Sequence, residues 1–411
     1  MTPLETALDT VSPNPVFVFG NHHTEQGVQS LVDSSIEEGT AVFYPIGSVQ
    51  DHGEAIVDLG TEPGWRVLTT FVTPPLVDAV AEGAVEYVPV RASDHTAFVR
   101  QRFADRHVVL VCHVPSTTVD GAHTFGLACP HAPELFDWAD TTVAVRNDAI
   151  PVVSGPTRPV DSWDIRVSTT EPLPSFRTNR SPIADEIGEN VASLVPNGAT
   201  IQLGIGSIPN AVSRSLSGKS TLSVHSGVIS DGLLALIESG VVSASPDRPA
   251  ITSQVIGETE TFYERLENQD AFELKSSATV HDPCTMAAHE RFVTINGAIE
   301  VDLSGQVNAS HIGTTQYAAP GGLPDFVEGT RRSPNGSSIV AMQSRANEET
   351  PKIVPNIGAG ARVDVSRTNV DYVVTENGIA DLRNNTRSER AEALIEIAHP
   401  DDRPQLRATI S

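Results

Sequence analysis

The chain has 411 residues, of which 39% are apolar and 19% are charged, and its 52 acidic against 27 basic residues give a formal charge of −25. This length predicts two domains, and the apolar fraction excludes a disordered chain. A uniformly anionic surface repels phosphate backbones and anionic lipid headgroups, so we expect neither nucleic acid nor a membrane as a partner.

The N-terminal residues carry neither a basic region nor an apolar region of the kind found in signal peptides. The longest apolar runs, such as 108–112, have the length of a strand and are far too short to span a membrane. Three cysteines are too few for a disulfide framework. We therefore expect a cytoplasmic, soluble protein.

One cysteine and histidine grouping raises the question of a metal. The pairs Cys112-His113 and Cys129-Pro130-His131 contain donors that suit Zn²⁺, but their spacing is not that of a chelating motif. We expect these four residues to belong to the core and to loops, and we expect no metal. The same interpretation applies to His22 and His23, which follow a predicted strand.

The first half of the chain alternates short apolar runs with helical periodicity. A buried strand at 15–19 is followed by a turn and by a helix over 26–36, whose apolar residues recur on one face. Such alternation is typical of a mostly parallel sheet with helices on its faces. Further elements are expected as strands at 40–44, 84–90, 107–113 and 141–145 and as a helix at 75–82.

A Pro- and Ser-rich stretch over 154–182 interrupts this pattern and is the predicted domain boundary. We expect an N-terminal α/β domain over 1–180 and a C-terminal α/β domain over 181–411. The second domain begins with an amphipathic helix over 183–195, which Pro196-Asn197-Gly198 ends.

The second half opens with the same order of strand, glycine turn and helix as the first, which suggests a loose internal repeat. Pro209 lies in the first turn of the helix at 208–216, where its missing N–H costs little. Asp231 is the predicted N-cap of a helix at 232–238. The remaining elements are strands at 199–203, 222–225, 251–256, 292–296, 339–342 and 372–375 and a final helix at 388–398.

Turns that follow strands are the candidate ligand sites, because ligands bind beyond the carboxyl ends of strands in open α/β sheets. In Gly204-Ile205-Gly206, two glycines before a helix expose N–H groups that suit a phosphate or the oxyanion of a thioester. His225 and Ser226 end a strand, where adjacent side chains point to opposite faces and do not form a catalytic pair.

A third candidate turn is the run 319–326, which contains Gly321 and Gly322. The sequence predicts that this run is neither helix nor central strand, and paired glycines again offer exposed N–H donors. From the residues alone, an ordinary structural turn explains each of these segments at least as well as a ligand site does.

The second half resembles the acetyl-CoA hydrolase/transferase family, the class I CoA-transferases that include 4-hydroxybutyrate and butyrate–acetate CoA-transferases. The resemblance is nearly continuous over about 190–400, whereas the first half is similar in layout only. The segments that carry the resemblance are 190–212, 230–242, 295–308, 338–342, 353–355, 371–383 and 397–400.

The resemblance implies two open, mostly parallel α/β domains with an active-site cleft between them. It implies acyl-CoA and a carboxylate as substrates, no metal and a homo-oligomer. In such enzymes a glutamate attacks the thioester, forms an acyl-glutamyl anhydride and then becomes a glutamyl-CoA thioester. The Gly321-Gly322 and Gly204-Ile205-Gly206 turns would then be the two oxyanion holes, and Asn296 would lie beside the reacting group.

The sequence departs from the family at the nucleophile. The family usually has His-Ser/Thr-Glu before Ser-Asp-Gly, whereas this chain has His225-Ser226-Gly227. The family's Gly-Gly-Gln is Gly321-Gly322-Leu323 here, and Pro320 replaces the preceding glycine. Glycine has no side chain, so residue 227 cannot form an anhydride.

Three hypotheses remain open at this point. The chain is a CoA-transferase or hydrolase whose carboxylate comes from elsewhere, with Glu376 as the candidate. Alternatively, it is a hydrolase or a direct acyl-transfer enzyme without a glutamyl-CoA intermediate, in which His225 acts as general base. The third hypothesis is a CoA-binding homologue without catalytic activity.

Overall fold

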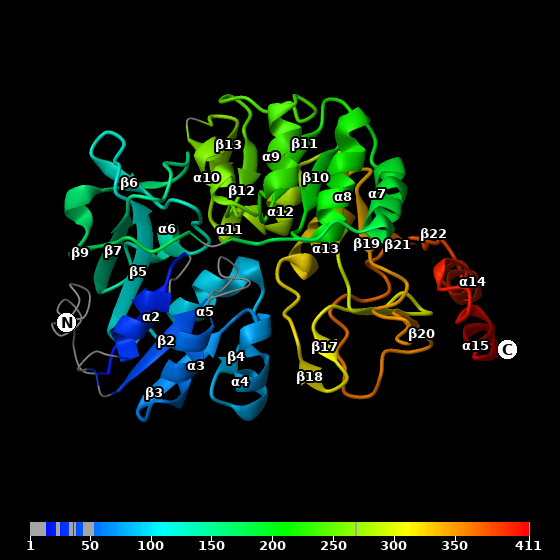
Figure 1. Cartoon of the computed structure of the whole chain (residues 1–411), viewed down its shortest axis with the longest axis horizontal. Coiled ribbons are helices and arrows are strands. Elements are labelled where there is room, and N and C mark those ends of the chain that lie inside the picture. The colour runs from blue at the N-terminus through cyan, green and yellow to red at the C-terminus, as the bar shows by residue number, and fades with distance from the viewer. Residues whose placement is uncertain are drawn as a thin grey trace. The chain divides into compact units, whose positions relative to one another are not determined.

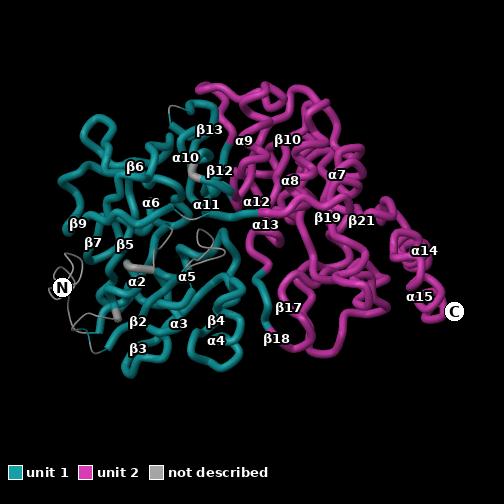
Figure 2. The backbone as a smooth tube through the Cα atoms, in the orientation of Figure 1, with its two compact units in different colours: residues 1–177, 251–280, 316–319 teal, residues 178–250, 281–315, 320–411 magenta. Residues whose placement is uncertain are grey.

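The computed structural model describes residues 14–21, 25–32, 36, 38–43, 53–173, 175–267 and 269–410. His22, His23 and the last residue of the strand expected at 40–44 lie outside these ranges. The chain divides into two compact units (Figure 2): unit 1 contains residues 1–177, 251–280 and 316–319, and unit 2 contains 178–250, 281–315 and 320–411. The chain first passes from unit 1 to unit 2 after Arg177, and two later segments belong to unit 1 again.

Unit 1 is built on a seven-stranded parallel sheet (Figure 1) in the order β4-β3-β2-β1-β5-β7-β9. All residues of β1 and β5 are buried, as expected for central strands covered on both faces. The strands are β1 (Val16–Phe19), β2 (Gly39–Phe43), β3 (Trp65–Thr69), β4 (Glu86–Tyr87), β5 (Val108–Pro115), β7 (Thr141–Asn147) and β9 (Ile165–Thr169).

Helices and short strands complete unit 1. Apolar side chains of β1, β2, β5 and β7 form one core with those of α2 and α3, in which Phe19 stacks on Phe43 with ring centroids 4.6 Å apart. The remaining elements are α2 (Glu25–Val32), α3 (Glu54–Thr61), η2 (Pro74–Leu76), α4 (Val77–Glu82), η3 (Ala92–Asp94), α5 (His95–Arg102), β6 (Ala122–Thr124), α6 (Ala132–Leu135), β8 (Thr157–Pro159), η4 (Val160–Ser162), β12 (Ala250–Thr252), α10 (Glu260–Leu266), β13 (Phe272–Leu274) and α11 (Ser277–Val280).

Unit 2 contains strands in the order β11-β10-β14-β19-β21-β22, and only β22 runs antiparallel to its neighbour. The strand order reverses between β10 and β14, which is where an open α/β sheet places its ligand crevice. The strands are β10 (Thr200–Leu203), β11 (Ser223–Ser226), β14 (Phe292–Asn296), β19 (Ser337–Ala341), β21 (Tyr372–Thr375) and β22 (Gly378–Asp381).

The helices of unit 2 pack on this sheet, α13 against β14 and β19 and α7 against β19 and β21. Thr386 and Glu389 form a capping box at the start of α14. The helices are α7 (Pro182–Leu194), α8 (Ser207–Ser215), η5 (Leu216–Gly218), α9 (Asp231–Glu238), α12 (Pro283–Ala287), α13 (Leu323–Arg332), α14 (Arg387–Ile397) and α15 (Arg403–Ala408), and the short strands are β15 (Glu300–Asp302), β16 (Val307–Asn308), β17 (His311–Ile312), β18 (Thr315–Gln316) and β20 (Ile353–Val354).

The expected fold class, mixed α/β with mostly parallel sheets, is confirmed, and two local expectations are wrong. The run 319–326 is not entirely a turn, because α13 begins at Leu323 with Pro324 in its first turn, where the helix has no use for the missing N–H. Asp231 is the first residue of α9 and Ser230 is its N-cap. Across the described ranges, no helix is long and apolar enough to cross a membrane.

Candidate active site

The candidate residues of unit 2 gather at the carboxyl edge of its sheet. Because β10, β11, β14, β19 and β21 are parallel, their C-terminal ends share that edge. The Gly204-Ile205-Gly206 turn follows β10, Gly227 follows β11, and Glu376 follows β21. His225 and Ser226 end β11, and Asn296 ends β14.

The Gly204-Ile205-Gly206 turn presents backbone N–H groups in front of helix α8. All three residues are partly exposed, and within the described ranges their N–H groups donate no hydrogen bond. Gly206, the N-cap, has φ +126°, a conformation that side chains disfavour. A Cβ on Gly204 would have no neighbour within 4 Å. The turn therefore has both the donors and the open space that an anionic group requires.

Asn296 makes a reciprocal amide pair with Gln202 at the point where the strand order reverses. The Gln202 Nε2 group donates to Asn296 Oδ1 over 3.3 Å, and Asn296 Nδ2 donates to Gln202 Oε1 over 3.1 Å. The pair joins β10 to β14 and fixes the orientation of the Asn296 side chain beside the glycine turn.

Ser226 and His225 both turn into the protein. The hydroxyl of Ser226 donates to the carbonyl of Leu203 over 2.8 Å and ties β11 to β10. His225 is 1% exposed, and its Nδ1 lies 3.0 Å from Nε2 of His289. Burial lowers the pKa of His289, which favours the neutral form of its imidazole. Both side chains therefore contribute to the packing of β11 against its neighbours.

Gly227 faces a histidine that the sequence analysis did not select. A Cβ built on Gly227 would lie 3.0 Å from Nε2 of His281, and one built on Gly322 would lie 2.7 Å from the same nitrogen. The His281 ring is 4% exposed and packs on Phe326 with centroids 4.9 Å apart. The space beside residue 227 is therefore occupied by an imidazole that also touches the second glycine turn.

The packing of two helices brings His281 to this position. Asp282 caps α12, accepting hydrogen bonds from the N–H groups of Cys284 (3.1 Å) and Thr285 (2.9 Å), so that His281 directly precedes the helix. Helix α12 packs on α13, and Gly329 permits a close approach because a Cβ there would lie 2.6 Å from Met286 Cβ. The starts of both helices thereby converge at His281 and Gly322.

The Gly321-Gly322 turn offers a second set of donors. Gly321 has φ +55°, and Gly322 is the N-cap of α13. Among the described residues, neither N–H is used in a hydrogen bond, and both glycines are partly exposed. These donors lie next to the imidazole of His281, so a base and a candidate oxyanion hole are neighbours.

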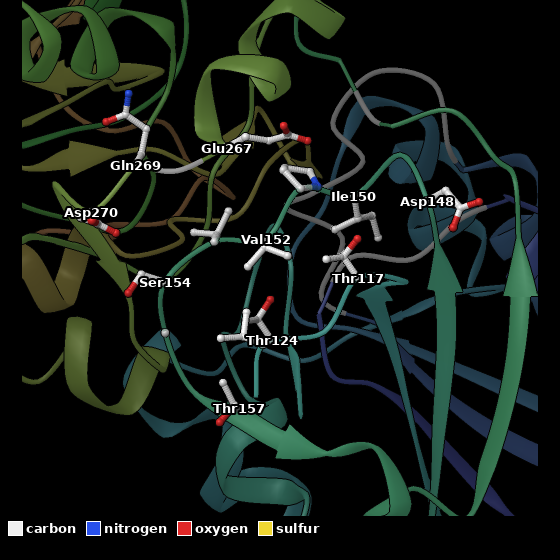
Figure 3. Close-up of a pocket in the computed structure, with 14 residues that line it drawn as sticks. Thr117, Thr124, Asp148, Ile150, Val152, Ser154, Thr157, Glu267, Gln269 and Asp270 are labelled. Carbon is white, nitrogen blue, oxygen red and sulfur yellow. The ribbon is translucent and has the colours of Figure 1, made fainter. Parts of the chain in front are cut away.

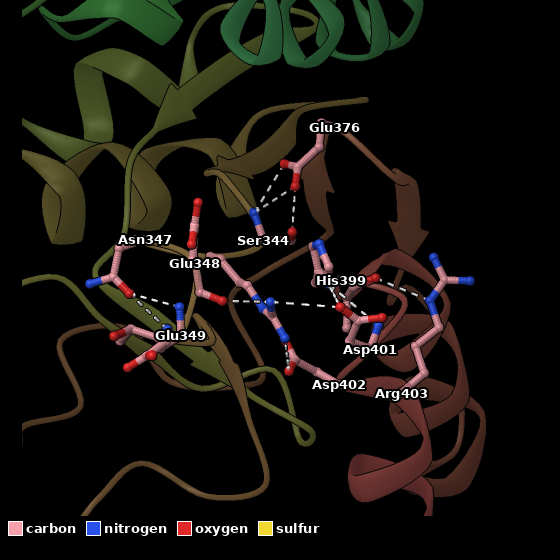
Figure 4. A network of polar contacts seen from close by, with 12 residues as sticks. Ser344, Asn347, Glu348, Glu349, Glu376, His399, Asp401, Asp402 and Arg403 are labelled. Atoms are coloured by element: carbon pink, nitrogen blue, oxygen red, sulfur yellow. Dashed lines mark hydrogen bonds and ion pairs between the residues drawn. The ribbon is translucent and has the colours of Figure 1, made fainter.

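Glu376 is held by its surroundings (Figure 4). Its carboxylate accepts hydrogen bonds from the N–H of Ser344 over 3.0 Å and from the Ser344 hydroxyl. It also accepts one from the Asn377 amide over 3.3 Å. Residue Arg345, next to Ser344, forms a two-bond ion pair with Asp402 of 2.9 and 2.6 Å. A carboxylate that accepts hydrogen bonds from three donors is held in one orientation, which suits a framework role better than nucleophilic attack.

Lys352 lies close enough to Glu376 to interact with its charge. Burial lowers the pKa of Lys352 to about 8 from 10.5, while the charge of Glu376 opposes that shift. Between these two pH values the unfolded chain retains a proton that the folded chain has lost, so this residue destabilises the fold most at or below pH 8.

We therefore expect Lys352→Met to raise the free energy of unfolding at pH 7 by about 1–3 kcal/mol, because methionine needs no buried charge. The gain should shrink as the pH rises from about 8 toward 10.5. Urea unfolding at pH 7 and pH 10 measures this effect, with Lys219→Met as the control. An equal gain at both pH values would contradict the assignment.

Unit 1 holds the histidines and cysteines considered for a metal. Cys112 and Cys129 are buried free thiols, and burial raises the pKa of both. His131 stacks on His95 with centroids 3.6 Å apart. In the described part of the chain, no three His, Cys, Asp or Glu residues are grouped as metal ligands.

Unit 1 also contains a cavity of about 630 Å³ (Figure 3). Its lining includes Asp148, Glu267 and Asp270, and no Lys or Arg. Such a lining repels the phosphates of CoA. None of the predicted site residues borders it; the other lining residues are Thr117, Val119, Thr124, Ile150, Pro151, Val152, Val153, Ser154, Gly155, Thr157 and Gln269.

Glycine turns at the carboxyl edge of an open α/β sheet are a common arrangement for binding an anionic group. Residues 258–410 match the family described as acetyl-CoA hydrolase/transferase C-terminal domain. The 4-hydroxybutyrate coenzyme A transferase of Clostridium kluyveri is 34% identical over 355 residues, which are 84% of this chain and 82% of that protein.

Two solved structures extend the comparison. RipA from Yersinia pestis superposes with a TM-score of 0.90 at 26% identity, and the match covers 100% of this chain and 96% of that one. The 4-hydroxybutyrate CoA-transferase from Porphyromonas gingivalis superposes with a TM-score of 0.80 at 28% identity, with the same coverage. The chain belongs to the acetyl-CoA hydrolase/transferase family and is an acyl-CoA-processing enzyme of the CoA-transferase type.

Proposed function

We propose that this chain hydrolyses acyl-CoA thioesters by direct attack of water, without a glutamyl-CoA intermediate. The observation that carries the proposal is the position of Gly227. The family resemblance places the nucleophilic glutamate there, and in this chain the neighbouring space is filled by His281. In the family's route, CoA passes from one carboxylate to another through a nucleophilic side chain that carries CoA between the two half-reactions. Glycine has no such side chain.

The remaining parts of the site suit thioester chemistry. Attack on a thioester carbonyl creates a tetrahedral oxyanion, and preorganised N–H donors stabilise it by about 3–4 kcal/mol each. The turns at Gly204–Gly206 and Gly321–Gly322 supply such donors. They also offset locally the formal charge of −25, which otherwise disfavours a phosphorylated ligand.

The test is the release of free CoA from acetyl-CoA and butyryl-CoA, followed with a thiol reagent in the presence and absence of acetate. The proposal predicts CoA release without any carboxylate acceptor, at a rate that acetate does not increase. Conversion of butyryl-CoA and acetate into acetyl-CoA and butyrate, followed by chromatography and without release of free CoA, would instead support CoA transfer through another carboxylate. Binding of acyl-CoA in a calorimeter with no release would support a CoA-binding homologue without activity.

Adding a methyl group at residue 204 tests whether this turn is a ligand site or an ordinary turn. We expect Gly204→Ala to weaken acyl-CoA binding at least tenfold, because the methyl enters space that the protein leaves empty. Its unfolding midpoint in urea should stay near that of wild type, because neither a clash nor a positive φ opposes alanine. Gly218→Ala, which also meets no neighbour, is the matched control. Unchanged binding by Gly204→Ala would make the turn purely structural.

A further inference from the structure

We infer that His281 is the general base of this site and that its imidazole has taken the place beside residue 227. The inference rests on the proposed hydrolysis and names the residue that performs it. One of the three hypotheses drawn from the sequence has His225 as the general base, but this residue lies buried against His289. His281 is the imidazole that faces both Gly227 and the donors of the Gly321-Gly322 turn.

The contacts around His281 show which residues its imidazole ring faces. Phe326 covers the ring, with the two planes inclined by 54°. Its Nε2 edge lies toward the positions where side chains at 227 and 322 would begin, at 3.0 and 2.7 Å. Both residues are glycines, so the nitrogen faces backbone that is partly exposed. The same edge of the ring thus faces residue 227 and the second glycine turn.

His225 and His281 occupy separate positions in one aromatic cluster. Phe292 packs on the His225 ring at 5.8 Å, and Phe326 lies between Phe292 (6.4 Å) and His281 (4.9 Å). The two phenylalanines therefore link the histidines through apolar contacts. Both histidines therefore belong to unit 2 and are separated by these two aromatic rings.

The step that we assign is balanced. His281 Nε2 takes a proton from water as the water oxygen bonds to the thioester carbon, and the carbonyl oxygen becomes an oxyanion held by backbone N–H groups. Collapse of this intermediate breaks the C–S bond. The proton on the imidazole then passes to the departing thiolate, so that one acyl-CoA and one water give one carboxylic acid and one CoA.

The test compares acetyl-CoA hydrolysis by wild type, His281→Gln and His311→Gln. The control removes a histidine that is also buried in unit 2, at 7% exposure, but that contacts Ser310. General base catalysis contributes about 10²–10⁴-fold, so His281→Gln should lose at least 100-fold in kcat with little change in KM. His311→Gln should stay within about threefold of wild type. Unfolding midpoints establish that all three proteins are folded.

A folded His281→Gln that keeps kcat within a few fold would overturn the inference while hydrolysis by wild type still stood. Equal losses in both variants would also overturn it, because the effect would then not be specific to His281. If wild type itself releases no CoA, the proposed function fails and the inference fails with it. His281→Ala gives a second measurement: millimolar imidazole should restore part of its activity, and it should do nothing for Gly204→Ala.

Discussion

Gly227→Glu alone is expected to leave the protein without a covalent CoA intermediate, whereas Gly227→Glu combined with His281→Ala is expected to form one. Even the first carbon of a side chain at 227 would lie 3.0 Å from His281 Nε2. A carboxylate beyond it therefore competes with the imidazole for the same space. Removing the imidazole opens the place in which a glutamate attacks the thioester.

The measurement is intact-protein mass spectrometry after rapid quenching during incubation with acetyl-CoA. The double variant should gain the mass of CoA, in an adduct that hydroxylamine removes. Gly227→Gln with His281→Ala has nearly the same shape and no nucleophile, so it should gain none. An adduct of equal yield in the single variant Gly227→Glu would show that His281 does not occupy the position of the glutamate.

Gly322→Ala is expected to reduce hydrolysis of acetyl-CoA by about 100-fold or more. Its methyl group would lie 2.7 Å from Cδ2 and Nε2 of His281 and from a ring carbon of Phe326, so the imidazole must move. A displacement of about 1 Å in a reacting group can cost about 100-fold in rate. The turn N–H groups beside it would move with the same adjustment.

Gly218→Ala is the control for this substitution, because its methyl group meets nothing within 4 Å. Steady-state kinetics give kcat and KM, and thermal unfolding reports whether the core around Phe326 has loosened. A folded Gly322→Ala with wild-type kcat would contradict the proximity of this glycine to the catalytic group.

The sequence predicted most of the sheet in unit 2 because its central strands are short apolar runs bounded by polar residues. The strands predicted at 292–296 and 372–375 are β14 and β21 within the same limits. Helix α13 was missed because its start, Gly322-Leu323-Pro324, has the composition of a turn, and packing on α12, β14 and β19 stabilises it as a helix.

The candidate site was predictable where topology determines it. Parallel strands bring their following turns to one edge, which places the Gly204–Gly206 turn, Gly227, Asn296 and Glu376 on the same side of the sheet. No local pattern indicates His281, because its position depends on the close approach of α12 to α13 at Gly329. Contacts between distant segments of this kind have no signature in a single sequence.

The chain is strongly acidic overall, but the site lacks the acidic residue that the family resemblance leads us to expect. The chain carries 52 acidic residues, and none of them is at position 227, where the family resemblance places the nucleophile. Glu376, the alternative carboxylate, is held by Ser344 and Asn377 in a fixed orientation. An imidazole in contact with two glycine positions is therefore the chemical feature that distinguishes this site.

The central claim is that acyl-CoA is consumed here without a covalent bond between CoA and the protein. The direct measurement is the intact mass of wild type, quenched at several times during turnover of acetyl-CoA, with and without acetate, beside the release of free CoA. We predict that free CoA accumulates over many turnovers while the protein mass remains unchanged. A CoA adduct at near one per chain, formed as fast as CoA is released and removed by hydroxylamine, would contradict the claim.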